Sequence, residues 1–224
     1  MVTLFGKKTG CLAGFILVLL LVLPVSVQSA ETDGQVVKRI AVVDFQPLLP
    51  EEGSTMVVCP LCSGGYSSGK IEKGAEKTVQ EGFIDKLRDF KEVQIIPLEK
   101  VTAVYNRVAA EKLKQPLLAV LKKVGAELKA DVIAVGYVYR YTERVGYDYS
   151  AEHPASVAFE IQLLNVKDGS TIWRGVFDKT QKSLMENVFQ ASSFFKGGGK
   201  WLTASQLAKQ GIDEIFKTFL GFEQ

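Results

Sequence analysis

Residues 156–178 carry the clearest secondary-structure signal in the chain, an apolar alternation with a period of two. One face of residues 156–166 carries Val157, Phe159, Ile161 and Leu163, and the other carries Ala158, Glu160, Gln162 and Leu164. Such alternation is typical of a half-buried strand. Lys167-Asp168-Gly169-Ser170 has the sequence of a tight Asp-Gly turn, and residues 171–178 then return as a second strand. The segment is therefore predicted to form an antiparallel hairpin.

The other predicted elements are strands and helices that alternate along the chain. Runs of β-branched and apolar residues predict buried strands at 38–45, 93–97 and 131–141. Apolar residues at helical spacing predict amphipathic helices at 71–87, 101–108 and 117–128. A last helix begins after Thr203, because Thr203 and Gln206 have the spacing of a capping box. We therefore expect an α+β fold in which a single mixed β-sheet packs with amphipathic helices.

The first 30 residues have the three parts of a secretory signal. Lys7 and Lys8 precede an apolar run at residues 12–25, and small or polar residues follow that run. The run is shorter than the roughly 20 residues that span a bilayer as a helix. Residues 1–30 are thus predicted to form a signal helix for export, followed by one α+β domain at 31–224. An uncleaved anchor at residues 1–30 remains an alternative, since no clean Ala-x-Ala cleavage site is found.

Composition excludes one large class of partners. The chain has 27 basic and 25 acidic residues, and loss of Lys7 and Lys8 with the signal would leave a balanced charge. Binding to nucleic acid usually requires a basic face, so no nucleic-acid partner is expected. No cofactor is predicted either.

Cys59 and Cys62 lie in a segment at residues 46–70 that is rich in Pro, Gly and Ser and is predicted to be a loop. An oxidising compartment favours a disulfide between them. A catalytic thiol usually needs a helix N-terminus or a cation to lower its pKa, and the nearest predicted helix starts only at residue 71. A zinc site needs four ligands, and the sequence offers only the lone His153 in addition. A disulfide is the expected state; a metal shared between two chains and redox catalysis remain open.

No catalytic constellation is found elsewhere. Residues 64–71 nearly match a phosphate-binding loop, but Ile71 replaces the Ser or Thr that would bind magnesium. His153 has no recognisable Ser or Cys partner. The protein is therefore expected not to be an enzyme, and no metal site is predicted within one chain.

Aromatic residues supply the candidate partner-binding positions. Tyr137, Tyr139 and Tyr141 are predicted to share one face of a strand, and Tyr147 and Tyr149 follow in a charged loop. Interface cores favour tyrosine, although such a stripe can also be part of the core. The remaining candidates adjoin a glycine run, where burial under the last helix is the alternative, and they are Phe194 and Phe195.

The order of the elements resembles a family of bacterial envelope proteins. The residues that carry the resemblance are RIAVVDF at 39–45, VQIIP at 93–97, Ala130-Asp131-Val132 and the hairpin FEIQLLNVKDGSTIW at 159–173. The family groups the curli-secretion channel subunit with penicillin-binding-protein activator lipoproteins and with the N-terminal domain of the Tol-system propeller protein. Its members are usually lipoproteins, whereas the only cysteine near the apolar run here, Cys11, precedes it.

What the resemblance implies is a non-enzymatic accessory or assembly protein that acts by binding proteins of the envelope. We expect it to work in the periplasm or at the periplasmic face of the outer membrane, and a homo-oligomer is compatible with this role. Membrane contact would involve residues 1–30 if they are not cleaved. The alternatives are a periplasmic thiol-redox protein that uses Cys59 and Cys62, and a small-ligand-binding domain.

Overall fold

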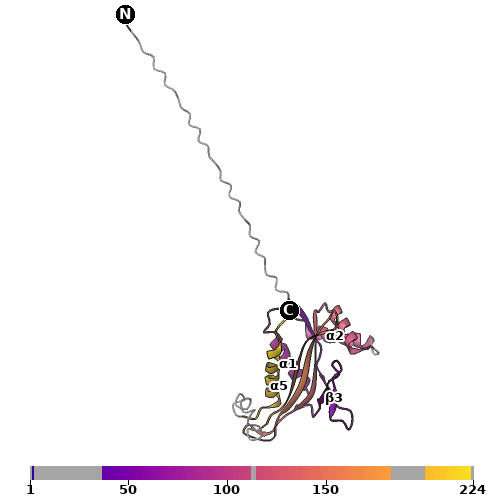
Figure 1. The fold of residues 1–224 in the computed structure, drawn as a ribbon, viewed down its shortest axis with the longest axis vertical. Coiled ribbons are helices and arrows are strands. Elements are labelled where there is room, and N and C mark those ends of the chain that lie inside the picture. Colours follow the sequence, from indigo (N-terminus) through magenta and orange to yellow (C-terminus); the bar gives the residue numbers. More distant parts are fainter. Residues whose placement is uncertain (1, 3–36, 112–114, 183–199, 223–224) are drawn as a thin grey trace. The chain divides into compact units, whose positions relative to one another are not determined.

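A six-stranded mixed sheet forms the centre of the fold in the computed structural model (Figure 1). The structure describes residues 2, 37–111, 115–182 and 200–222. The predicted signal sequence, apart from residue 2, and the candidates Phe194 and Phe195 lie outside these residues. Among the described residues no helix is long and apolar enough to cross a membrane.

The strand order of the sheet is β10-β9-β6-β1-β5. Its strands are β1 (Lys38–Val42), β5 (Val93–Ile95), β6 (Val132–Thr142), β9 (Ser156–Asn165) and β10 (Thr171–Thr180), with the short β2 (Gln46–Pro47) beside β6. β1 pairs in parallel with β5 and β6, while β9 is antiparallel to both of its neighbours. Parallel neighbours need crossover connections, which the helices supply.

The predicted hairpin is confirmed as β9 and β10, in which Ile161 opposes Gly175. Gly169 adopts φ 83° in the connecting turn, a left-handed conformation that favours glycine. The predicted mixed sheet with packed helices is also confirmed. The helices are α1 (Ala75–Leu87), α2 (Leu98–Glu111), α3 (Leu117–Glu127) and α5 (Ala204–Ile215), followed by the 3₁₀ turn η2 (Phe216–Thr218).

Helices cover both faces of the sheet (Figure 1). α1 and α5 pack on the face that carries Val157, Phe159 and Ile161. α2 and α3 lie on the opposite face, over β1 and β6. Both faces of the sheet are thus buried, which explains why the strands at its centre are apolar on both faces.

The segment at residues 46–70, predicted to be a loop, contains a second small sheet. β3 (Met56–Val58) and β4 (Gly65–Ser67) form an antiparallel hairpin, whose Val57 and Cys59 are buried against the α2/α3 face.

Because both faces of the sheet are covered, the prediction that β9 is half-buried is wrong. Glu160 and Gln162, on the face expected to meet solvent, are only 0% and 2% exposed.

The prediction that Tyr137, Tyr139 and Tyr141 share one face of a strand is wrong, because β6 contains a bulge. Val138 opposes Phe159 and Arg140 opposes Ala158, so Tyr139 is an extra residue in the ladder. Tyr137 and Tyr139 consequently lie on the α2/α3 face, whereas Tyr141 lies on the α1/α5 face.

Candidate functional site

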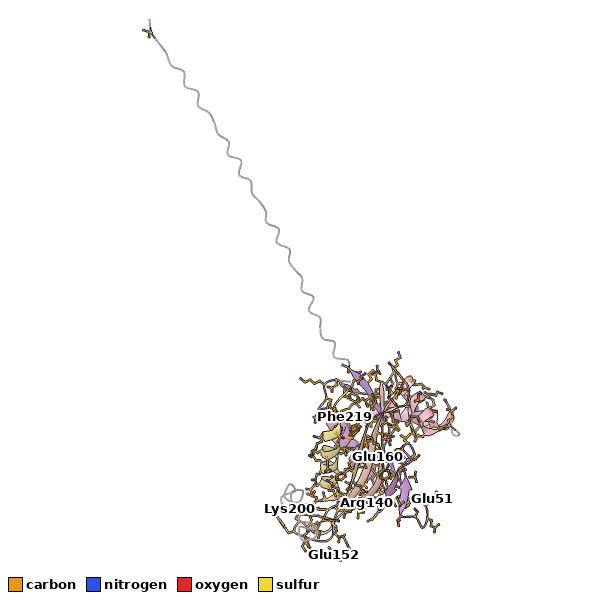
Figure 2. All side chains as sticks on the ribbon, viewed as in Figure 1. Glu51, Arg140, Glu152, Glu160, Lys200 and Phe219 are labelled. Atoms are coloured by element: carbon orange, nitrogen blue, oxygen red, sulfur yellow. The ribbon has the colours of Figure 1, made fainter. Side chains whose placement is uncertain are left out.

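A carboxylate with no exposed surface lies at the centre of the candidate site. Glu160 projects from β9 within the body of the domain (Figure 2). Arg174 of β10 donates from Nε to its Oε1 at 2.6 Å, and Tyr139 of β6 donates to Oε2 at 3.0 Å. Gln162 donates to Oε1 at 2.5 Å. Tyr137 opposes Glu160 in the ladder, and Tyr139, two residues further along β6, lies on the same α2/α3 face, so its hydroxyl reaches the carboxylate.

Glu160 is held in its charged form. Burial alone would raise the pKa of its carboxyl, but hydrogen bonds from Arg174, Tyr66 and Tyr139 outweigh burial and the pKa is lowered. The bond to Glu160 likewise raises the pKa of Arg174. The two side chains form an ion pair whose acidic partner is buried and whose basic partner is 41% exposed.

The turn between β3 and β4 places both cysteines over this carboxylate. Cys59 Sγ lies 3.9 Å from Glu160 Oε1, and Cys62 Sγ lies 3.7 Å from Oε2. Both are free thiols in the structure, so the expected disulfide is not present and stays a prediction. Burial raises the pKa of the Cys59 thiol. A raised pKa is the opposite of what a catalytic thiol needs, and it therefore disfavours the redox alternative.

Tyr66 of β4 completes the cover of the site. Its ring stacks on Tyr139 with centroids 4.1 Å apart and planes inclined by 7°. Its hydroxyl accepts a hydrogen bond from Arg174, whose Nη2 also lies 3.6 Å from Cys62 Sγ. The β3–β4 hairpin is thus fastened to the sheet by a polar cluster, the cysteine–glutamate cluster of Cys59, Cys62, Tyr66, Tyr139, Glu160, Gln162 and Arg174.

A second candidate site is a small exposed hairpin formed by β7 (Val145–Tyr147) and β8 (Ser150–His153). The sequence predicts this segment to be a charged loop, so the hairpin corrects that prediction. Tyr147 and Tyr149 are 83% and 74% exposed. Lys200 lies over the Tyr149 ring, 5.5 Å from its centroid. The hairpin thus holds two large aromatic surfaces in solvent.

Ion pairs and backbone bonds hold this hairpin on the domain. Arg144 donates to the Trp201 carbonyl at 2.6 Å and also pairs with Asp148. The Trp201 amide donates to the Asp148 carbonyl at 2.7 Å. Glu143 accepts from the Ala204 amide at 3.1 Å, at the start of α5. Contacts of Glu143, Arg144 and Asp148 therefore hold the tyrosine-bearing hairpin in place. The sequence shows that these residues are charged, but it does not show their partners.

The other predicted partner-binding residues lie elsewhere. Tyr137, Tyr139 and Tyr141 are at most 6% exposed and belong to the core, which corrects their assignment to a partner surface. Bulky rings in the middle of a sheet are buried here because both faces are covered. His153 is exposed on β8 and does not approach the cysteines closely enough to group with them as a metal ligand.

An open hollow bears on the small-ligand alternative. It has a volume of about 420 Å³, and its lining includes Lys38, Asp131, Asn165, Trp173 and Phe219. None of its lining residues belongs to the cysteine–glutamate cluster.

No protein-family model and no curated protein matches the sequence. Among solved structures, a PelC dodecamer from Paraburkholderia phytofirmans is 13% identical with a TM-score of 0.44, covering 80% of this chain and 85% of that chain. The hypothetical protein CT253 from Chlamydia trachomatis is 12% identical with a TM-score of 0.45, covering 82% and 95%. The C-terminal domain of LpoB from Salmonella enterica is 13% identical with a TM-score of 0.36, covering 66% and 87%.

LpoB is a penicillin-binding-protein activator. Identities of 13% or less and TM-scores below 0.5 do not place the chain in the family of any of these proteins.

Proposed function

We propose that the protein is an exported, non-enzymatic accessory protein of the cell envelope that binds another envelope protein through the β7–β8 hairpin. The export signal predicted at residues 1–30 supports a location outside the cytoplasm. The exposed pair Tyr147 and Tyr149 supports the binding surface, and it is the observation on which the proposal chiefly rests.

Two features make this hairpin suited to binding. Tyrosine offers a large contact area with few rotatable bonds, so little conformational entropy is lost when it is immobilised. The backbone conformation of the hairpin also depends on a glycine. Gly146 adopts φ 114°, and a Cβ at this position would lie 2.5 Å from the Ser150 carbonyl oxygen. A preformed aromatic surface binds with a smaller ordering cost than a flexible loop.

The test is the double variant Tyr147→Ala/Tyr149→Ala. Partner capture by crosslinking in intact cells should fall at least tenfold, because aromatic residues at the centre of an interface often contribute about 2 kcal/mol or more each. The melting temperature should stay unchanged, since both side chains are exposed and contribute little to the core.

The matched control is Leu49→Ala, a truncation of another exposed apolar side chain (70% exposed) outside the hairpin. It should leave capture unchanged. Equal capture by wild type and the tyrosine variant would refute the assignment of this surface, and a lowered melting temperature would show that the tyrosines support the fold.

A further inference from the structure

Three potential metal ligands converge where the β3–β4 turn meets β9. They are the thiols of Cys59 and Cys62 and the carboxylate of Glu160, and their ligand atoms all lie within 4.8 Å of one another. Glu160 is about a hundred residues from the cysteines in sequence and belongs to a different element. A single chain therefore brings together three ligands where the sequence alone suggests only two.

The backbone of the turn holds the two sulfurs in place. The Cys62 amide donates to Cys59 Sγ at 3.2 Å, and the Ser63 amide donates to the Cys59 carbonyl at 3.0 Å. The Cys59 amide in turn donates to the Gly64 carbonyl at 2.9 Å. These bonds fix the positions of both sulfurs relative to the carboxylate, and each sulfur must lose its proton when it binds a metal. Cys62 is partly exposed, which gives an ion access from solvent.

The carboxylate is also prepared for a ligand role. Tyr139 and Gln162 donate to its two oxygens and fix its orientation, as hydrogen-bonded neighbours do for carboxylates in metal sites. The contacts that an ion would replace are the two long S–H···O contacts from the cysteines, at 3.9 Å and 3.7 Å. These are the weakest bonds that Glu160 makes in the cluster.

We propose that, with both cysteines reduced, Cys59, Cys62 and Glu160 bind one Zn²⁺ ion, with a fourth position open to water. Binding would displace both thiol protons to solvent. Two thiolates, one carboxylate and Zn²⁺ sum to a single negative charge, and Arg174, already paired with Glu160, neutralises it. Thiolate sulfur and carboxylate oxygen are both common zinc ligands, and three protein ligands with one open position are a known zinc arrangement.

The consequence for the fold is a link between the β3–β4 hairpin and β9. Without an ion the hairpin is attached there by hydrogen bonds from Arg174 to Tyr66 and from Gln162 to Cys59, and by stacking of Tyr66 on Tyr139. Zinc would add bonds that the unfolded chain cannot make, and it would therefore raise the melting temperature. A disulfide between Cys59 and Cys62 would exclude the ion, since both sulfurs must be thiolates.

The test uses the folded mature protein, reduced and freed of metal under inert gas. Titration calorimetry with Zn²⁺ should show one ion per chain, and Co²⁺ should give the absorption bands of tetrahedral thiolate coordination. The double variant Cys59→Ser/Cys62→Ser should abolish both signals. Glu160→Gln should weaken zinc binding at least tenfold while both cysteines remain. Circular dichroism confirms that each variant is folded. If the double variant does not fold, the single variant Cys62→Ser replaces it, because Cys62 is partly exposed and its substitution disturbs the core least.

His153→Ala is the matched control, because an exposed histidine can hold zinc adventitiously. It should bind zinc with unchanged affinity and stoichiometry. The proposal is overturned if the reduced wild type binds zinc no better than the double cysteine variant. It is also overturned if Glu160→Gln binds as tightly as wild type, which would leave only a two-cysteine contact.

Discussion

At the scale of single residues, the stability of the site depends on one buried ion pair. Glu160 has no exposed surface, and its charge is compensated by Arg174 together with neutral donors from Tyr139 and Gln162. Removal of one partner from such a pair leaves an uncompensated charge in a region of low dielectric. Because Arg174 is 41% exposed, water can compensate part of that loss.

Glu160→Gln should lower the free energy of unfolding of the metal-free protein by about 2 kcal/mol at neutral pH, the typical range for lost hydrogen bonds to a charged group. The control is Glu214→Gln, which removes the carboxylate paired with Lys179 at 2.6 Å on the surface. That change should cost less than about 1 kcal/mol. Denaturant unfolding in the presence of a chelator measures both, and equal losses would contradict the importance of burial at Glu160.

The lowered pKa of Glu160 also predicts a pH dependence. A carboxyl whose pKa is lower in the folded state stabilises the fold at pH values above its unfolded pKa, about 4.3. That contribution is lost as the pH falls through the lower folded pKa. The difference in unfolding free energy between wild type and Glu160→Gln should therefore be constant near neutral pH and shrink below about pH 4. A difference that grows on acidification would show that the sign is wrong.

At the scale of elements, the sequence predicted helix starts and tight turns well, because these depend on residues that are close together in sequence. The capping box is an example: Thr203 accepts from the Gln206 amide at 3.2 Å, and the Gln206 side chain accepts from the Thr203 amide at 3.0 Å. The Asp-Gly turn before β10 is another. The bulge at Tyr139 could not be predicted, because an extra residue in a ladder depends on the partner strand. Alternation along β6 alone therefore put Tyr141 on the wrong face.

Thr203→Ala should destabilise the protein by about 1 kcal/mol, the usual cost of a lost N-cap. Thr203→Ser keeps the hydroxyl that accepts from Gln206 and should stay within a few tenths of a kcal/mol of wild type. Chemical denaturation compares the three proteins. Equal losses in both variants would mean that the methyl group, and not the cap, stabilises the start of α5.

At the scale of the whole molecule, the fold class and the order of strands and helices could be predicted, but the cysteine–glutamate cluster could not. The β3–β4 hairpin comes from a segment whose Pro, Gly and Ser content predicts only a loop, and it covers the polar face of β9. That cover turns Glu160 from an expected surface residue into a buried ligand candidate. Tyr147 and Tyr149 flank Asp148 in a charged segment, and both are exposed as this position indicates. Tyr137 and Tyr139, which the sequence offered as partner-binding or core residues, are core residues under this hairpin and helices α2 and α3.

Site-specific photocrosslinking in intact cells tests the proposed role most directly. A photoreactive amino acid replaces Tyr147 in one variant and Leu49 in another, both at exposed positions. If the β7–β8 hairpin is the binding surface, the probe at position 147 should give one discrete crosslinked envelope protein, and the probe at position 49 should not. No crosslink from position 147, or the same crosslink from both positions, would contradict the proposal that the protein binds its partner through this hairpin.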